Sequence, residues 1–306
     1  MKRVLITGAR GFIGRYCLEP LQRRGYQVTA ATSSRDLPRG TGAEWRTADL
    51  LDPAQTAQLI EEVRPTHLLH LAWFAKPGVY WNAAENLQWL EASQSLLSCF
   101  QRCGGRRVVG AGTCAEYAES SGVYHERSTP AAPNSLYGRC KNALRHNLEG
   151  LSKATGLSAA WGRVFYLYGA EGPLEKFPQS VVASVVRGLP ALCTHGRQVR
   201  DFLDVRDAAD AFVALLDCQV EGTVNIGSGR GRRLAEIAMR LAERCGRPDL
   251  LRLGALPART NEPAVIIADT MRLRDEVGWR PRIDIEQGLD ELADFSLRSV
   301  AHECVV

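Results

Sequence analysis

A strand, a glycine-rich loop and a helix follow one another in VLITGARGFIGR, from Val4 to Arg15. Glycine is needed where a backbone turns sharply and where main-chain N–H groups must contact a phosphate. Gly8, Gly11 and Gly14 have the spacing G-x-x-G-x-x-G, and the following helix presents its positive N-terminal end to an anion. This pattern predicts a dinucleotide site; a turn with a purely structural role is the alternative.

Short apolar runs alternate with helix-length segments along the first half of the chain. The predicted strands are 3–8, 26–32, 66–73, 106–113 and 157–165, and the predicted helices are 11–25, 53–64, 86–104 and 137–156. Such alternation predicts an α/β fold with a Rossmann-type doubly wound parallel sheet covered on both faces. After Gly169 the pattern loosens, with a short helix at 177–188 and a largely irregular region at 259–285. We expect a smaller, mixed C-terminal substrate domain there.

Charge and cysteine content exclude several classes of function. The net charge is +4 and the Lys and Arg residues are scattered, so no nucleic-acid partner is expected. No apolar run approaches the roughly 18 residues of a membrane span. The nine cysteines include no C-x-x-C pair, which predicts reduced thiols and no metal site. Because a strand pattern begins at residue 3, no signal peptide is expected and we predict a cytoplasmic location.

The end of the second predicted strand determines which dinucleotide we expect. A free ribose 2′-OH usually meets an Asp or Glu there, but YQVTAAT is followed by Ser33, Ser34 and Arg35. Hydroxyls and guanidinium groups suit a 2′-phosphate, so Arg10 and Arg35 would hold it from two sides, which favours NADP(H) over NAD(H). Two alternatives remain open. Asp36 binds the ribose, or both arginines are solvated surface residues.

Tyr137 and Lys141 are four residues apart in LYGRCKNALRHNLE, which places them on one face of a helix. An ammonium beside a phenol stabilises the phenolate and lowers the pKa of the phenol. Tyr137 would then exchange a proton with a sugar hydroxyl or ketone while hydride moves to or from a nicotinamide. The hydroxyl of Thr113, at the end of the strand 106–113, is expected to bind the reacting oxygen.

These motifs resemble the extended short-chain dehydrogenase/reductase family, which includes nucleotide-sugar epimerases, dehydratases and ketoreductases. TGARGFIG is similar to its TGxxGxxG loop, ADLLD to D-L-x-D, HLAW to H-L-A-A, GRVFYLYG to R-x-x-N-V-Y-G, and VRDFLDVRDAADA to R-D-F-x-x-V-x-D-x-A. Asn86 begins a stretch that is similar to the family's N-x-x-x-T-x-x-L-L-E-A helix. The likeness covers nearly the whole chain.

The resemblance implies a role for individual residues. The catalytic residues would be Thr113, Tyr137 and Lys141. The cofactor would contact Gly8, Arg10, Gly11, Phe12, Ile13, Gly14, Ser33, Ser34, Arg35, Asp49, Leu50, Leu71, Ala72, Tyr137 and Lys141. The substrate would contact Thr113, Tyr166, Arg200 and Arg259, with the two arginines on the diphosphate of a sugar nucleotide. The NAD(P)-binding Rossmann domain would span 1–167 plus about 204–228, and the nucleotide-sugar substrate domain 168–203 plus 229–306.

Departures from the family pattern bear on the reaction. Cys114 and Ala115 follow Thr113 where 4,6-dehydratases carry acids, and Glu116 is expected to turn away, which disfavours dehydration. Cys114 is either a catalytic acid or an inert buried thiol. Tyr166 replaces an asparagine and would stack on a ring or hydrogen-bond it. One group of aromatic residues either lines a sugar pocket or packs the loop: Trp73, Phe74, Tyr80 and Trp81.

The expected function is NADP(H)-dependent reduction of a nucleotide-linked 4-keto-6-deoxy sugar at C4. In some NADP(H)-dependent reductases of the family, arginines are similarly placed at the positions of Arg10 and Arg35. The alternatives are an NAD-dependent nucleotide-sugar 4-epimerase and, less favoured, a 4,6-dehydratase or a non-catalytic dinucleotide sensor. By resemblance we also expect a homodimer formed through helices 86–103 and 137–156.

Overall fold

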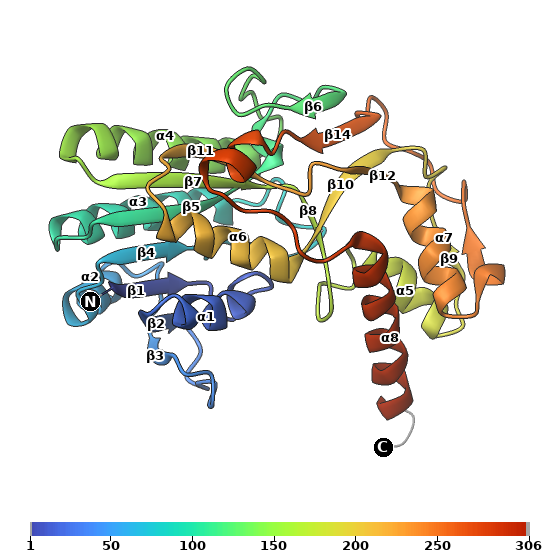
Figure 1. The fold of residues 1–306 in the computed structure, drawn as a ribbon, viewed down its shortest axis with the longest axis horizontal. Helices are drawn as coiled ribbons and strands as arrows, with labels where there is room; N and C mark the ends of the chain where they lie inside the picture. Colours follow the sequence, from blue (N-terminus) through green and yellow to red (C-terminus); the bar gives the residue numbers. More distant parts are fainter. Residues whose placement is uncertain (1, 304–306) are drawn as a thin grey trace.

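A seven-stranded sheet forms the larger part of the protein in the computed structural model, which describes residues 2–303. Its strands are β1 (Lys2–Thr7), β2 (Tyr26–Thr32), β3 (Glu44–Thr47), β4 (His67–His70), β5 (Arg107–Thr113), β7 (Ser158–Val164) and β11 (Gly222–Ile226). They lie in the order β11-β7-β5-β4-β1-β2-β3, and all neighbours are parallel (Figure 1). The order reverses direction at β1, so the doubly wound α/β prediction is confirmed.

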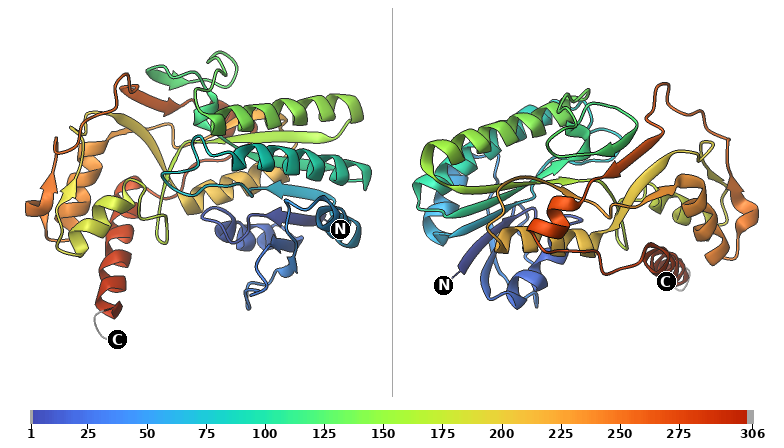
Figure 2. Two further views of the ribbon diagram at one scale, coloured as in Figure 1. Left: turned by 180° about the vertical axis from the view of Figure 1, so that it is seen from behind. Right: turned by 45° about the horizontal axis from the view of Figure 1, so that its top comes forward.

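Helices cover both faces of this sheet (Figures 1 and 2). On one face lie α1 (Gly14–Arg23) and α6 (Val205–Asp217); on the other lie α2 (Pro53–Val63), α3 (Glu85–Arg102) and α4 (Leu136–Thr155). Successive side chains of a strand point to opposite faces. Val4 and Ile6 of β1 therefore pack under α1 and α6, whereas Leu5 packs under the other three helices.

Local signals explain where the helices begin and end. The Asp52 carboxylate accepts hydrogen bonds from the N–H groups of Ala54 and Gln55 and begins α2. The Ser135 hydroxyl accepts one from Gly138 N–H and begins α4, which ends at Gly156 with a φ of 73°. The helix predicted at 137–156 is confirmed to within one residue at each end.

A second group of elements lies beside the carboxyl end of the large sheet (Figures 1 and 2). Its sheet has the order β12-β10-β14-β6, and β8 pairs with β10. The elements are β6 (Gly122–Tyr124), β8 (Tyr166–Tyr168), β9 (Ala191–Leu192), β10 (Val199–Asp204), β12 (Gly231–Arg233), β13 (Leu251–Arg252), β14 (Val265–Ala268), α5 (Gln179–Val186), α7 (Leu234–Arg244) and α8 (Ile285–Glu303), with short helical turns at Cys114–Glu116, Pro248–Leu250 and Arg272–Glu276. The expected smaller part with a mixed sheet is confirmed, and its role in binding substrate stays a prediction.

Three predictions of secondary structure differ from the structure. The strand predicted at 66–73 ends at His70, and the following residues form a loop. β3 was not expected, because EWRT is polar and forms an exposed edge. β14 lies inside the region predicted to be irregular, because its four residues are too few for a clear period.

The proposed division into two domains runs to residue 306, and residues 304–306 lie outside the described part of the chain. β6 falls within the first 167 residues, yet it pairs with β14 of the smaller sheet. Within the described residues, no helix is long and apolar enough to cross a membrane.

Candidate active site

The glycine loop is closed so tightly that side chains are excluded from two of its positions. Gly8 has a φ of 69°, and a Cβ atom there would lie 2.7 Å from the main-chain nitrogen of Ala72. A Cβ on Gly14 would lie 2.2 Å from the carbonyl oxygen of Gly8. The loop therefore leaves a bare backbone surface at the N-terminus of α1, which fits the pyrophosphate of a dinucleotide.

A cavity of about 1390 Å³ runs from the glycine loop to the second sheet. Of the residues expected to contact cofactor, its wall includes Gly8, Arg10, Gly11, Phe12, Ile13, Gly14, Ser33, Asp49, Leu50, Leu71, Ala72, Tyr137 and Lys141. Of those expected to contact substrate, it includes Thr113, Tyr166, Arg200 and Arg259. Ser34 and Arg35, although both are described, are not part of this wall. One cavity thus brings nearly the whole predicted site together.

Arg10 lies against the segment that follows β2. Its Nη1 donates a hydrogen bond to the carbonyl oxygen of Asp36 at 2.7 Å. Asp36 therefore meets Arg10 through its main chain, and its carboxylate has no hydrogen bond to this arginine. The structure places Arg10 on the cavity wall, but it does not bring Arg35 to the opposite side as the two-arginine arrangement requires.

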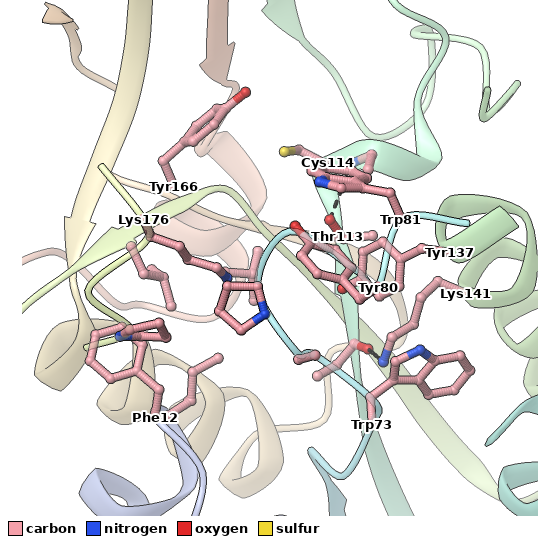
Figure 3. A pocket seen from close by; sticks show the side chains of 18 of the residues that line it. Phe12, Trp73, Tyr80, Trp81, Thr113, Cys114, Tyr137, Lys141, Tyr166 and Lys176 are labelled. Carbon is pink, nitrogen blue, oxygen red and sulfur yellow. Dashed lines mark hydrogen bonds between the residues drawn. The ribbon is translucent and has the colours of Figure 1, made fainter. Parts of the chain in front are cut away.

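A close approach of α4 to β5 places Tyr137 beside Thr113 (Figure 3). Thr113 is the last residue of β5. A Cβ on Gly138 would lie 2.4 Å from the carbonyl oxygen of Ala115, so only glycine lets the helix come this near. The main-chain N–H of Tyr137 donates to the carbonyl of Trp81 at 3.0 Å, which fixes the start of the helix against the loop after β4. The sequence interpretation overlooked Gly138, although its place between Tyr137 and Lys141 was visible.

Lys141 is buried and Tyr137 is partly buried, and the effects on their pKa values differ. Burial raises the pKa of the Tyr137 phenol and Tyr80 raises it further, whereas a hydrogen bond with Thr113 lowers it. Burial lowers the pKa of Lys141 to about 7, against an opposing effect of Glu116. The Lys141 ammonium donates to the carbonyl of Ala111 at 2.8 Å. The expected lowering of the phenol pKa by Lys141 is therefore not what this structure shows, because desolvation of the phenol dominates.

Glu116 is turned into the protein interior. Its carboxylate accepts hydrogen bonds from Arg163 Nε at 2.8 Å, from Trp161 Nε1 at 2.9 Å and from the main-chain N–H of Thr113 at 2.8 Å. Both Glu116 and Arg163 are buried. The expectation that Glu116 faces away from the reacting position is confirmed, and its carboxylate instead holds the end of β5 in place.

The two arginines expected to bind a diphosphate each have a carboxylate partner. Arg200 is 3% exposed and pairs with Glu262 at 2.6 Å, and its guanidinium lies 5.7 Å from the ring centre of Tyr166. Arg259 pairs with Glu119 at 2.8 Å. Because both arginines line the cavity already hydrogen-bonded, an anionic substrate would have to share or displace these carboxylates.

Aromatic rings surround the phenol of Tyr137 (Figure 3). Tyr80 and Trp81 stack at a centroid distance of 4.7 Å, and both meet Tyr137 edge-on, at 4.9 Å and 6.0 Å. Trp73, Tyr80 and Trp81 line the cavity, whereas Phe74, also described, is not in its wall. Three of the four aromatic residues therefore line the pocket, as one of the two interpretations predicts.

Two further side chains complete this wall. Burial raises the pKa of the Cys114 thiol to about 12, which agrees with an inert thiol. Lys176, which the sequence interpretation overlooked, places its ammonium 5.5 Å from the ring centre of Tyr80. In the sequence, only the scarcity of lysine could have drawn attention to Lys176, because the chain has just five.

The fold and the site together define a dinucleotide-binding α/β protein of the extended short-chain dehydrogenase/reductase type. Residues 4–227 match the model of the NAD dependent epimerase/dehydratase family. The chain therefore belongs to this family, whose members are enzymes.

Individual relatives resemble the chain over most of its length. It is 24% identical to a UDP-glucose 4-epimerase of Rhizobium leguminosarum bv. trifolii, with 98% of each chain covered. It is 26% identical to a dTDP-6-deoxy-L-talose 4-dehydrogenase (NAD(+)) of Aggregatibacter actinomycetemcomitans, over 76% of this chain and 86% of that one. The crystal structure of a Thermus thermophilus UDP-glucose 4-epimerase in complex with NAD has a TM-score of 0.83 at 27% identity, covering 96% of this chain and 98% of that one.

Proposed function

We propose that the protein is an NAD-dependent nucleotide-sugar 4-epimerase. The observation that carries the proposal is one cavity whose wall includes the glycine loop, Thr113 and Tyr137 as well as Arg200 and Arg259. The full-length similarity to UDP-glucose 4-epimerases supports this function over the ketoreductase that we expected from the sequence. The homodimer through α3 and α4 is also part of the proposal.

The residues of the chain have separate roles in this reaction. NAD, held by the glycine loop, would supply a hydride acceptor. Tyr137 exchanges the proton of the sugar 4-hydroxyl, and Thr113 hydrogen-bonds the same oxygen. Because burial raises the pKa of the phenol, Tyr137 is ready to donate to a 4-keto oxygen. To accept a proton it needs positive charge beside it, and the proposal gives this role to Lys141.

The cofactor that remains bound after purification tests the proposal. We expect denatured protein to release NAD, and we expect the native protein to interconvert UDP-glucose and UDP-galactose without added dinucleotide. Liquid chromatography of the released nucleotide and of the sugar nucleotides measures both. Protein that retains no dinucleotide and instead consumes NADPH with a nucleotide-linked 4-keto-6-deoxy sugar would contradict epimerisation.

A 4-ketoreductase that uses NADP(H) is the second candidate, because Arg10 reaches the segment after β2 where a 2′-phosphate would lie. No carboxylate ends β2, and one relative is a 4-dehydrogenase of a dTDP-linked deoxysugar. The Glu116 carboxylate accepts hydrogen bonds from Trp161 and Arg163 in the interior, so it is not placed to move protons of a sugar. This also supports a reaction without dehydration.

Replacing Arg10 with alanine separates these two candidates. If Arg10 binds a 2′-phosphate, we expect NADPH affinity to fall about tenfold or more, the effect of losing one charge-assisted hydrogen bond, and NADH affinity to stay unchanged. Fluorescence titration of nucleotide-free protein measures both constants. Arg15→Ala is the matched control, since Arg15 lies on α1 but pairs with Glu171 outside the wall. Equal losses for NADPH and NADH would instead assign Arg10 a structural role at the Asp36 carbonyl.

A further inference from the structure

Trp73 lies flat against the ammonium of Lys141. The Nζ atom is 3.9 Å from the centre of the indole ring, well inside the range of a cation–π contact. Trp73 is the last residue of HLAW, where the similar family motif H-L-A-A has alanine. Figure 3 shows the indole below Lys141 on the cavity wall, on the side away from Thr113. A large π surface therefore occupies a position that in the family pattern carries only a methyl group.

The position of the indole is fixed by Asn86. The Nε1 of Trp73 donates to the side-chain oxygen of Asn86 at 2.8 Å. Asn86 is fully buried, and its amide nitrogen donates to the carbonyls of Tyr80 at 2.7 Å and Ala83 at 2.9 Å. The ring of Trp89 is nearby, tilted, at a centroid distance of 6.4 Å. Because Asn86 is itself held by two carbonyls, its hydrogen bond to the ring edge leaves the indole little freedom to leave the lysine.

Besides Trp73, few of the described groups stabilise the positive charge of the Lys141 ammonium. Its hydrogen-bond partner is the carbonyl of Ala111, and the ring of Trp161 is more distant, at 6.0 Å. The titratable groups near it are Glu116 from the turn after β5, His70 from β4 and Tyr137 one turn earlier on α4. Glu116 is engaged by Arg163, Trp161 and Thr113, and burial lowers the pKa of His70 to about 3, so that the imidazole is neutral. Among the described residues, no carboxylate is hydrogen-bonded to Lys141.

We propose that Trp73 is a positioning residue for the reaction: its indole face, oriented by Asn86, keeps the Lys141 ammonium charged and fixed on the cavity wall beside Tyr137. The proposal rests on the proposed function, since it assumes that Lys141 must carry charge next to the phenol. Trp73 replaces part of the hydration that a buried ammonium has lost, and it does so without placing a negative charge beside a phenol that must become a phenolate. A carboxylate in its place would oppose that ionisation.

The consequence is a defined pH dependence. A lysine whose pKa is lowered is charged below that pKa and loses its charge as the pH rises through it. Losing the indole face removes a stabilisation of the charged form only, so the pKa of Lys141 falls further. We expect Trp73→Leu to lower it by about one unit, given the strength of a desolvated cation–π contact, and Trp73→Phe to lower it by less. The alkaline limb of kcat/KM is expected to move to lower pH by the same amount.

The protonation of Lys141 can be measured without any assay of activity. The chain has five lysines, so 13Cε-lysine labelling gives five signals, which Lys→Arg variants assign. Titration of the Lys141 signal in the wild type, Trp73→Leu and Trp73→Phe tests the proposal. Trp89→Leu is the matched control, because it removes an indole that contacts Trp73 but is not within cation–π distance of Lys141 in this structure. An unchanged Lys141 pKa in Trp73→Leu, or an equal shift in Trp89→Leu, would overturn the proposal.

A second measurement covers the case in which Trp73→Leu does not fold. Fluorotryptophan weakens the π face while keeping the shape of the ring, and growth on it replaces all six tryptophans. We expect the Lys141 pKa to fall with fluorination in the wild type and to change far less in Trp73→Phe, where only the more distant Trp161 ring remains. Equal responses in both proteins would overturn the role of Trp73. If the Lys141 pKa shifts as expected but epimerase activity is absent from the wild type, the proposed function fails and the role of Trp73 stands.

Discussion

Replacing Tyr137 with phenylalanine is expected to lower kcat by about 10³-fold, within the range of a lost general acid–base group. The phenol hydrogen-bonds with Thr113 at the end of β5 and lies four residues before Lys141 on α4. Phenylalanine fills the same volume and keeps the edge-on contacts with Tyr80 and Trp81. We therefore expect dinucleotide affinity and melting temperature to change little, and steady-state kinetics beside a binding titration measures the difference.

Tyr80→Phe is the control for this experiment. Tyr80 also lines the cavity, and its ring centre is 4.9 Å from that of Tyr137. Tyr80→Phe removes the same phenolic hydroxyl group as Tyr137→Phe, yet it leaves the proposed proton donor in place. A loss in Tyr80→Phe as large as that in Tyr137→Phe would mean that the proton passes through Tyr80 and that the Tyr137 assignment is wrong.

The sequence predicts the part of the site that follows from local pattern. Gly8, Gly11 and Gly14 are constrained by a turn that spans only seven residues, and the Tyr137–Lys141 spacing is a property of a single helix. Thr113 could be placed because the carboxyl ends of parallel strands meet at one edge of a sheet. These predictions needed no knowledge of distant contacts, and the residues concerned lie together on one cavity wall.

The remainder depends on contacts between distant parts of the chain. The pairing of Arg259 with Glu119 joins residues 140 positions apart, and that of Arg200 with Glu262 joins residues 62 apart. Neither partner carries a pattern that identifies the other. The raised pKa of Tyr137 likewise results mainly from burial, and Tyr80, which lies edge-on to it in a loop of irregular sequence, raises it further. The effect of desolvation on a titratable group becomes visible only once the packing around it is known.

Sequence motifs also do not decide which reaction the site catalyses. Thr113, Tyr137 and Lys141 serve a reductase and an epimerase equally well, because both exchange a proton at the same oxygen. Arg10 and Arg35, with no acid at the end of the second strand, led us to expect NADP(H), while similarity along the whole chain favours a 4-epimerase. Arg10 is weaker evidence than similarity along the whole chain, because its hydrogen bond to the carbonyl of Asp36 also fits a purely structural role.

The largest expected loss of stability comes from replacing Glu116 with alanine. This substitution leaves the buried guanidinium of Arg163 without its carboxylate partner, and it also removes the acceptor for Trp161 Nε1 and for the N–H of Thr113. Breaking one side of a buried ion pair costs about 3–5 kcal/mol, because the remaining charge stays desolvated. We expect the melting temperature to fall by about 10 °C, measured by differential scanning calorimetry.

Two further variants show whether the unpaired charge is the cause. Glu116→Gln together with Arg163→Met removes both charges, so we expect it to recover most of the stability lost in Glu116→Ala. Glu119→Ala removes a carboxylate from the exposed pair with Arg259, and solvent replaces that contact, so its effect on unfolding is expected to stay below about 1 kcal/mol. If Glu119→Ala were as destabilising as Glu116→Ala, burial would not explain the difference. If the double variant were no more stable than Glu116→Ala, the unpaired charge on Arg163 would not explain the loss, because glutamine can still accept the main-chain N–H of Thr113.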